Sequence, residues 1–280
     1  MKWNLIFDVD KCTGCQNCTL AVQDEYIGNS FPGYAAEMPR HGKRWVEIER
    51  RDRGSHPIVD VAYAFHACQH CDDAPCVAAA KDGAAYKRPD GIVVIDPVKS
   101  KGQKQIAAAC PYGAVSWNEA LSIPQHWNFD AHLIDRGWTA PRPAQACPTG
   151  ALRALKVSDD EMVRIAREEG LEPLRPELNL RPRVHYRNLK RVRSEMLGGA
   201  LVGEIAGRDE CVAGANVRLY RDEALLQETR SDVFGEFRFD GLSAGGFRLE
   251  VDMPVFQKKI IEHRLETSAN LGDIRLKGVN

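Results

Sequence analysis

The stretch Lys99-Ser-Lys-Gly-Gln-Lys-Gln-Ile-Ala-Ala-Ala-Cys-Pro111 decides how this chain is organised. It aligns without gaps with Lys11-Cys-Thr-Gly-Cys-Gln-Asn-Cys-Thr-Leu-Ala-Val22, and the leading lysines and the glycines fall in register. The earlier copy has cysteines at three positions and a valine at the fourth. The later copy keeps only the fourth cysteine, and its other three positions hold Ser100, Gln103 and Ile106. Each copy therefore carries the cysteines that the other lacks.

The same loss occurs in a second pair of segments. Cys68, Cys71 and Cys76 form a triad in which Ala80 stands where a fourth cysteine could be, and Cys147-Pro148 is a single cysteine far from any other. Two triads and two Cys-Pro singles supply enough thiolates for two four-cysteine sites. The candidate ligands are Cys12, Cys15, Cys18, Cys68, Cys71, Cys76, Cys110 and Cys147.

The spacing of these cysteines favours iron–sulfur clusters. The complete run C-x2-C-x2-C-x3-C-P is that of bacterial two-cluster ferredoxins, in which the last cysteine ligates the other cluster. Structural zinc is the alternative, but it usually takes its ligands as two C-x2-4-C pairs. We therefore predict two 4Fe–4S clusters. The spacing does not decide whether Cys110 or Cys147 completes a given triad.

Three histidines lie near these motifs in the sequence or could act with them. His66, His70 and His185 are possible ligands or proton carriers. We interpret His66 and His70 as hydrogen-bond donors near a cluster, because such bonds adjust the potential of a metal site. Lys11 could raise the potential of a neighbouring cluster by its charge, or it could be an ordinary solvated lysine.

Composition excludes several classes of function. The 280-residue chain has a formal net charge of −1, which gives no reason to expect nucleic acid or an anionic membrane surface as a partner. No apolar run reaches about 18 residues, so no membrane span is predicted, and the first residues are typical of a strand rather than a signal peptide. Cysteine clusters without an export signal favour metal binding in a reducing compartment, so we expect a cytoplasmic protein, although a twin-arginine partner could export a folded complex.

The first part of the chain alternates strand patterns with loops. Strands are predicted at Lys2–Phe7, Gly91–Asp96 and Arg183–Arg187, and Val59–Phe65 leads into the second triad. Ser158 begins a capping box, so a short helix is predicted at Met162–Glu169 with Gly170 closing it. Residues 129–146 are predicted to be irregular because of their prolines. The arginine-rich insertion 23–59, with Trp45, is a solvated surface loop or, alternatively, a docking arm.

The pattern of apolar and polar residues changes near Gly198-Gly199. Short alternating segments separated by glycines follow, at Val202–Ile205, Ala215–Tyr220, Leu225–Thr229, Glu236–Phe239, Phe247–Val251, Lys259–Leu265 and Asp273–Leu276. We therefore predict an α+β protein: a ferredoxin-like two-cluster domain with insertions over residues 1–197, then a small antiparallel β-sandwich or barrel over 198–280. Cys211 stands alone in this second part, and we expect it to be a buried apolar filler.

The cysteine motifs resemble those of the iron–sulfur (β) subunits of dimethyl sulfoxide reductase-family molybdopterin oxidoreductases. The matching elements are Lys11-Cys-x2-Cys-x2-Cys18, Cys68-Gln-His-Cys-x4-Cys76, Cys110-Pro-Tyr-Gly113 and Cys147-Pro-Thr-Gly-Ala151. In such subunits the first motif shares its cluster with the last, and the second with the third. The resemblance implies one cluster on Cys12, Cys15, Cys18 and Cys147, and another on Cys68, Cys71, Cys76 and Cys110. Family members with more cysteines hold three or four clusters. With two clusters, this chain is not expected to carry electrons over a long distance to a remote acceptor.

The order of the parts looks like that of the small subunits of pyrogallol–phloroglucinol transhydroxylase and resorcinol hydroxylase. Pro182–Asn188 follows the cysteine-rich part, a transthyretin-like β-domain comes next, and Ser231–Phe239 is similar to carboxypeptidase-regulatory domains. This resemblance implies a large partner with a molybdenum bis-pterin guanine dinucleotide site that acts on a polyhydroxylated aromatic such as resorcinol or pyrogallol, by hydroxylation or transhydroxylation.

Within such a complex this chain would hold no catalytic residues of its own. It would relay single electrons to or from the molybdenum site, with a protein or a small carrier as the possible electron acceptor. Three alternatives stay open: a structural or assembly subunit, since transhydroxylation consumes no net electrons; an electron-transfer subunit of another molybdopterin reductase; and a freely diffusing ferredoxin. The β-domain and the arginine-rich insertion argue against the last.

Overall fold

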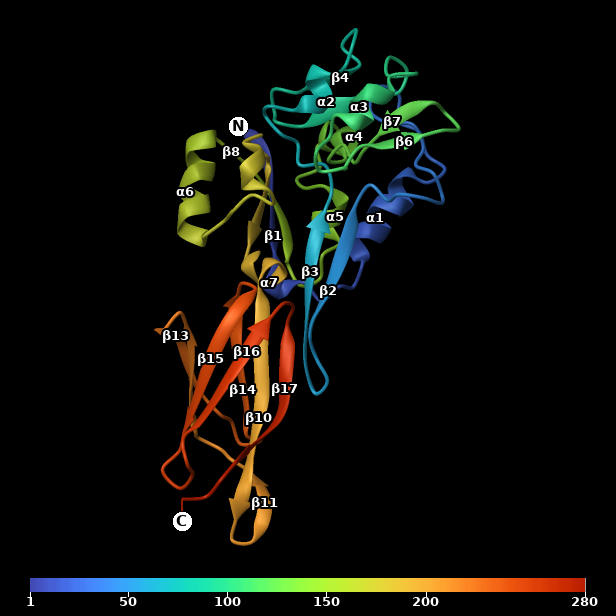
Figure 1. Cartoon of the computed structure of the whole chain (residues 1–280). Coiled ribbons are helices and arrows are strands. Elements are labelled where there is room, and N and C mark those ends of the chain that lie inside the picture. The colour runs from blue at the N-terminus through green and yellow to red at the C-terminus, as the bar shows by residue number, and fades with distance from the viewer. Residues whose placement is uncertain (280) are drawn as a thin grey trace. The chain divides into compact units, whose positions relative to one another are not determined.

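The computed structural model describes residues 1–279, which form two compact units (Figure 1). The first unit comprises Met1–Arg50 and Tyr63–Leu189, and the second comprises Arg51–Ala62 and the chain from Lys190 onward. The sequence-based boundary between residues 197 and 198 stays a prediction. No helix within residues 1–279 combines the length and the apolar character needed to cross a lipid bilayer.

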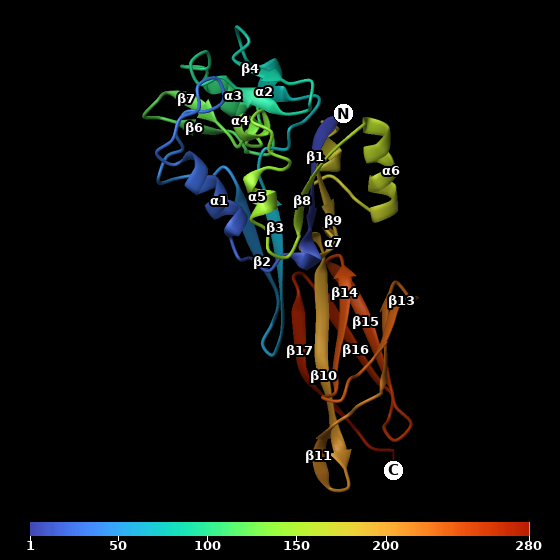
Figure 2. The ribbon, with the colours of Figure 1, turned by 180° about the vertical axis from the view of Figure 1, so that it is seen from behind.

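A three-stranded sheet forms the backbone of the first unit. Strand β1 (Lys2–Asp8) lies in the middle, antiparallel to β8 (Leu152–Val157) and parallel to β9 (Val184–Arg187) (Figure 2). All of β1 after its first residue is buried, as its apolar composition predicts. The pairing of Phe7 with Leu152 places the end of β1 beside the start of β8. The loops of Cys12 and Cys147 therefore leave the sheet at the same end.

Helices surround this sheet. Helix α1 (Asn17–Tyr26) packs beside the short α5 (Arg142–Gln145), as Figure 2 shows. The predicted helix with a capping box is confirmed as α6 (Asp159–Glu169): the Ser158 hydroxyl accepts a hydrogen bond from the Glu161 amide, and Gly170 ends the helix in a left-handed conformation.

The expectation that residues 129–146 are irregular is wrong. They contain α4 (Ala131–Ile134) and α5. Both prolines lie where helices accept them, since Pro141 precedes α5 and Pro143 falls in its first turn. An amide there has no partner within the helix, so the missing N–H of proline costs nothing.

Short hairpins and helices position the second triad, and the first of these hairpins belongs to the first unit only at its ends, since residues 51–62 lie in the second unit. The hairpins are β2 (Glu47–Ser55) with β3 (Ile58–His66), β4 (Ala85–Lys87) with β5 (Val93–Ile95), and β6 (Ser116–Asn118) with β7 (Ile123–Gln125). Between them lie α2 (Pro75–Ala78) and α3 (Lys104–Ala108), and η1 (Val9–Lys11) and η2 (Pro176–Leu178) are single 3-10 turns.

Trp45 does not have the surface position that the docking-arm interpretation of the arginine-rich insertion gives it, and the docking arm itself stays a prediction. Its side chain is only 3% exposed, and its ring lies 4.9 Å from the ring of Tyr26 in α1. Trp45 is therefore a core residue of the first unit.

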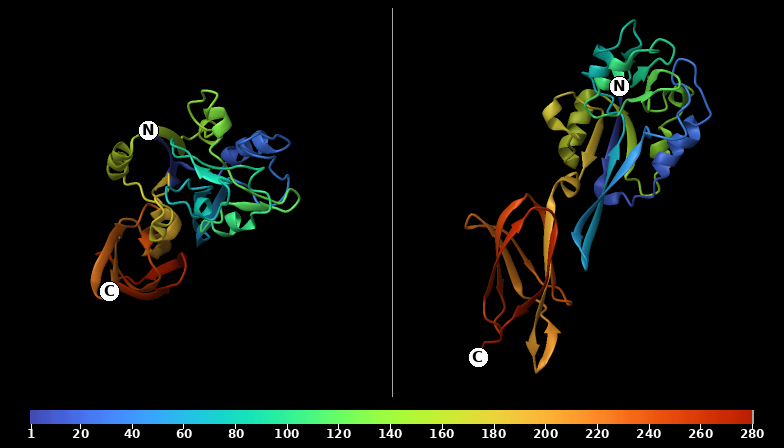
Figure 3. Two further views of the ribbon diagram at one scale, coloured as in Figure 1. Left: turned by 90° about the horizontal axis from the view of Figure 1, so that it is seen from above. Right: turned by 45° about the vertical axis from the view of Figure 1, so that its right-hand side comes forward.

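The second unit consists mainly of two sheets around one core. One sheet has the order β11-β10-β14 with β17 also pairing with β10, and the other has the order β13-β12-β15-β16 (Figure 3). The strands are β10 (Glu195–Ile205), β11 (Arg208–Cys211), β12 (Asn216–Arg221), β13 (Ala224–Arg230), β14 (Glu236–Leu242), β15 (Gly245–Asp252), β16 (Lys259–Leu265) and β17 (Ala269–Leu276), preceded by α7 (Lys190–Arg193).

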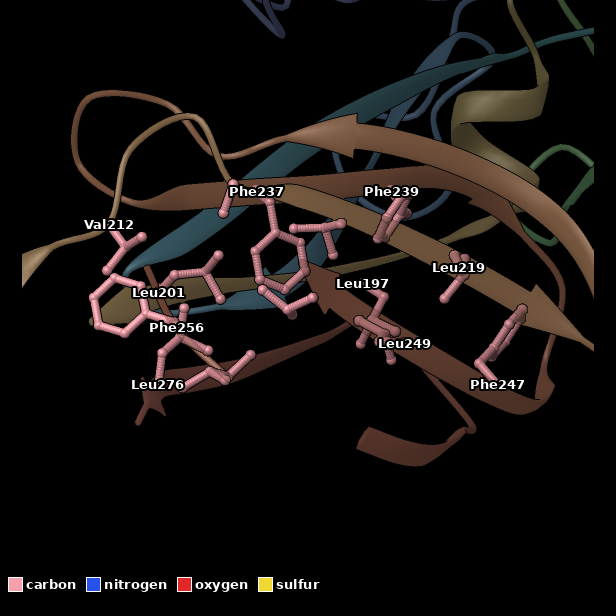
Figure 4. Close-up of a cluster of buried hydrophobic side chains, with 14 of the residues drawn as sticks. Leu197, Leu201, Val212, Leu219, Phe237, Phe239, Phe247, Leu249, Phe256 and Leu276 are labelled. Carbon is pink, nitrogen blue, oxygen red and sulfur yellow. The ribbon is translucent and has the colours of Figure 1, made fainter. Parts of the chain in front are cut away.

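Leucine and phenylalanine side chains from both sheets fill the core between them, including Leu197, Phe237 and Leu249 (Figure 4). The sheets are not purely antiparallel as predicted. Strand β17 pairs with β10 in parallel, because the chain reaches it from β16 in the opposite sheet.

Cys211 is exposed, so the expectation of a buried apolar filler is wrong. It ends β11, a strand whose residues are all exposed at the edge of its sheet, opposite Val202. The three charged residues Arg208, Asp209 and Glu210 that precede Cys211 are the sequence signal of this exposed strand.

Candidate metal centre

The first triad lies on a tight loop between η1 and α1. The Cys12 amide donates to the Val9 carbonyl over 3.3 Å, and Cys18 lies buried in the first turns of α1. Gly14 has φ 68°, and a Cβ at this position would lie 2.4 Å from Cε1 of Tyr63. The loop therefore needs glycine both for its backbone conformation and for the ring that covers it.

Cys147 joins this triad from the segment between α5 and β8. Its Sγ accepts from the Leu152 amide at 3.4 Å and lies 3.7 Å from the Thr149 hydroxyl. Burial raises the pKa of Cys18 to about 11, and the charges of Cys12 and Cys147 add to this rise. Burial also raises the pKa of Cys12, again with contributions from Cys147 and Cys15. These four thiols therefore lie within reach of one another's charge.

A second quartet forms beyond β3. Cys68, Cys71 and Cys76 are buried, with Cys76 inside α2, and Cys110 follows α3. Burial raises the pKa of Cys71 to about 12, and the nearby thiolates of Cys76 and Cys110 raise it further. Burial likewise raises the pKa of Cys76 to about 11, next to Cys110. Burial places the Cys68 pKa well above its ordinary value, with Cys76, Cys110 and Cys71 contributing.

The backbone around Cys68 and Cys71 is held from both sides. On one side the Arg183 amide donates to the Gln69 carbonyl at 2.8 Å, and the Gln69 side chain donates to the Tyr186 hydroxyl. On the other side, the Val93 amide in β5 donates to Nδ1 of His70 at 3.1 Å. These contacts come from the protein itself and hold the loop of Cys68 and Cys71 in place.

Lys87 of β4 supplies a positive charge to the same loop. Its ammonium donates to the His70 carbonyl at 2.6 Å and to the Cys71 carbonyl at 3.1 Å, and it pairs with Asp72 at 2.9 Å. His70 has φ 46°, a left-handed conformation that a residue other than glycine holds only with support. Lys87 is 17 residues from His70, so no local motif could have identified it.

The chemistry of the donors fits iron–sulfur ligation. All eight motif cysteines are free thiols, and backbone amides donate to several of them, as with Leu152 and Cys147. Thiols with raised pKa values that crowd one another gain from a cationic partner, and metal binding would release their protons. Among residues 1–279, no three cysteine, histidine or acidic side chains are arranged to hold a single metal ion.

The three histidines have other partners than the cysteines. Nε2 of His66 lies 2.8 Å from Oε2 of Glu49, and Nε2 of His185 lies 3.4 Å from Oδ1 of Asn4. Burial lowers the pKa of His185 to about 4, so it is neutral at pH 7. His70 accepts from the Val93 amide at Nδ1, so its neutral ring carries the proton on Nε2, and a hydrogen bond from Nε2 to a cluster stays a prediction.

The segment Lys99–Pro111, which keeps only one of the four cysteines, is held by hydrogen bonds of the Gln103 side chain. Oε1 of Gln103 accepts from the Lys81 amide at 2.8 Å, and its Nε2 donates to the carbonyls of Lys81 and Lys99 at 3.3 and 2.9 Å. Ile106 is fully buried in the core beside Cys76 and partly buried Ala80. An amide and an apolar side chain therefore occupy positions where the aligned copy has cysteines.

Comparison with known proteins supports this interpretation of the cysteines. A family model described as a 4Fe-4S dicluster domain matches residues 59–157. The sequence is 41% identical over 255 residues, 90% of each protein, to the pyrogallol hydroxytransferase small subunit of Pelobacter acidigallici. The protein therefore belongs to the same family of iron–sulfur subunits as this Pelobacter relative.

More distant relatives share the cysteine-rich part. The sequence is 31% identical over 141 residues to the iron-sulfur subunit of arsenate respiratory reductase from a Shewanella species, covering 50% of this chain and 55% of the relative. It is 28% identical over 163 residues to the electron transfer subunit of thiosulfate reductase from Salmonella typhi, and the alignment covers 58% of this chain and 80% of that relative. Like these relatives, the protein is an iron–sulfur subunit of an oxidoreductase complex.

Proposed function

We propose that this chain relays single electrons to or from a molybdenum site on a large partner subunit with a bis-pterin guanine dinucleotide cofactor. The substrate class is a polyhydroxylated aromatic such as resorcinol or pyrogallol, which the partner hydroxylates or transhydroxylates. The proposal is supported by the pyrogallol hydroxytransferase small subunit, which aligns over the β-rich second unit as well as the cysteine-rich part. The second unit is proposed to be a transthyretin-like domain.

We assign Cys12, Cys15, Cys18 and Cys147 to one cluster and Cys68, Cys71, Cys76 and Cys110 to the other. The observations that carry this assignment are geometric: the loops of Cys12 and Cys147 leave the same end of the sheet, and Cys71, Cys76 and Cys110 pack in one buried cluster. Each 4Fe–4S cluster would accept or give up one electron at a potential set by hydrogen bonds, charge and burial. The chain contributes buried thiolates, amide donors and a rigid loop frame.

Purification of the complex from its native host tests the proposal. We expect a much larger chain to co-purify, with about eight irons and eight acid-labile sulfides per copy of this chain. Zinc without labile sulfide would contradict the cluster assignment. Adding the aromatic substrate under anaerobic conditions should change the redox state of the clusters, followed by electron paramagnetic resonance (EPR).

One alternative has a specific observation in its favour. The Pelobacter relative is named a hydroxytransferase, and a transfer between two aromatics consumes no net electrons. If substrate never changes the state of clusters that are present, the chain is a structural subunit for that reaction. The cytoplasmic location and a carrier as electron acceptor stay predictions.

A further inference from the structure

Lys87 is a partly buried lysine of the first unit whose ammonium contacts a ligand loop directly, whereas Lys43, which donates to the Gly113 carbonyl of the Cys110 motif, is exposed. The side chain is 21% exposed, and Nζ donates to two carbonyls of the segment that holds Cys68 and Cys71. By contrast, Lys11, which precedes Cys12 in the sequence, is exposed. Water screens an exposed charge, whereas a partly buried charge acts at close range.

The charges around Lys87 do not cancel. Asp72 is 15% exposed and is shared by three cations, since Arg183 pairs with it and Lys2 Nζ lies 3.7 Å away. Asp159 pairs with the same Arg183 and Lys2. The exposed pair of Arg181 and Asp73 is neutral in sum. Three cations against two carboxylates leave one net positive charge beside the second quartet.

We propose that Lys87 is a positioning residue that raises the reduction potential of the cluster held by Cys68, Cys71, Cys76 and Cys110. Reduction adds one negative charge to a cluster, and a nearby positive charge stabilises the reduced state. The contacts to the His70 and Cys71 carbonyls hold the ammonium against the loop. The inference rests on the cluster assignment proposed above.

Two substitutions separate charge from packing. Lys87→Gln keeps an N–H donor near the carbonyls and removes the charge, whereas Lys87→Arg keeps the charge. We expect Lys87→Gln to shift the one-electron reduction equilibrium of one cluster about tenfold toward the oxidised form, which is ~59 mV to lower potential. The other cluster should not shift. Lys87→Arg should retain the wild-type potential, and so should Lys101→Gln, which removes an exposed lysine.

The measurement is a redox titration of the intact protein followed by EPR, with iron analysis of each variant. If two clusters are present and Lys87→Gln shifts neither, or shifts both alike, the role of Lys87 is refuted. Equal shifts in Lys87→Gln and Lys87→Arg would also refute it. A wild-type protein with fewer than two clusters would refute the cluster assignment itself.

Asp72→Asn supplies a test of opposite sign. It removes the carboxylate that faces Lys87, so the same cluster should become easier to reduce, by about tenfold in its equilibrium. This variant keeps the inference testable if Lys87→Gln does not retain iron. An unchanged or lowered potential in Asp72→Asn would overturn the inference.

Discussion

Gly14 and Gly102 occupy matching positions in the two aligned copies, yet their surroundings differ. Both have positive φ angles, of 68° and 77°. A Cβ on Gly14 would meet the ring of Tyr63 within 2.5 Å, whereas nothing lies within 4 Å of a Cβ on Gly102. The same backbone conformation therefore has a packing requirement only in the copy that keeps three cysteines.

Gly14→Ala is expected to remove one cluster. The new methyl group would displace Tyr63 and distort the loop of Cys12 and Cys15, so iron and labile sulfide should fall from about eight to about four per chain. Gly102→Ala is the matched control, with backbone strain of roughly 1 kcal/mol and full iron content. Equal iron loss in both variants would show that the glycines matter only for backbone strain.

His126 should make stability depend on pH. Burial lowers its pKa to about 4, and its Nδ1 lies 2.7 Å from the Trp127 carbonyl, to which it donates. The unfolded protein takes up a proton at this residue near pH 6.5 and the folded protein does not, so stability falls as pH drops from 6.5 toward 4. From pH 7 to pH 5 the loss from this residue is about 2 kcal/mol.

Thermal unfolding followed by tryptophan fluorescence measures this effect. His126→Asn should flatten the fall in melting temperature between pH 7 and pH 5, and His185 should account for part of the remaining fall. Replacing the exposed His41 by asparagine should leave the slope unchanged. A slope identical to wild type in His126→Asn would show that the residue is not held neutral.

At this scale the sequence predicts ligands better than their neighbours. The cysteines follow from spacing alone, because a cluster loop is local. Tyr63 and Lys87 were not identified, since each acts on a loop from a strand elsewhere in the sequence. The sequence offered one weak signal, because Tyr63 and Lys87 lie on strands β3 and β4, which flank the second cysteine triad in the sequence.

At the scale of secondary-structure elements, the Gln103 side chain connects the loop that follows α2 to the loop that precedes α3. Gln103→Ala removes its three bonds to backbone groups of Lys81 and Lys99. Because these bonds are exposed, we expect a loss of about 1 kcal/mol in the free energy of unfolding, with unchanged iron content. Chemical denaturation measures the loss, and Lys101→Ala in the same loop should cost less than half as much. Iron loss in Gln103→Ala would instead make the residue essential to a cluster.

Element prediction succeeded where pattern and capping agree, as in β1 and α6. It failed for α4 and α5, because helices of four residues show no periodicity and their prolines looked like breakers. The parallel pairing of β17 with β10 was also beyond reach, since register across a sandwich depends on the whole unit rather than on any segment.

On the scale of the whole molecule, the second unit contains a buried ion network that composition could not reveal. Arg53 is 1% exposed and pairs with Asp60 at 3.0 Å and with Asp240, while Asp60 also pairs with Arg191. Removing one partner of a buried pair leaves an uncompensated charge. This network joins residues 51–62 to the strands that follow residue 190 within one compact unit.

Arg53→Met should lower the stability of the second unit by about 3 kcal/mol, since two carboxylates lose a buried partner. Limited proteolysis should then cut within residues 51–62 at lower protease concentration than in wild type. Arg218→Met breaks the exposed pair with Glu228 and should cost at most about 1 kcal/mol. Equal protease sensitivity in the two variants would contradict a special role for Arg53.

The change in residue pattern near residue 198 predicts two parts, whereas the two compact units of the structure divide the chain at residue 190 and place residues 51–62 in the second unit. The membership of residues 51–62 in the second unit was not predictable, because it depends on Arg53 meeting Asp240 across 187 residues. Long-range ion pairs leave no trace in spacing or periodicity.

The amide bridge of Gln103 bears on the protein in its cluster-free state. Hydrogen bonds between an amide and the backbone form without iron, sulfide or a particular redox state. These three bonds should therefore hold the loops of Lys81 and Lys99 together whether or not a cluster is bound, and slow hydrogen exchange of the Lys81 amide in protein stripped of iron would show this.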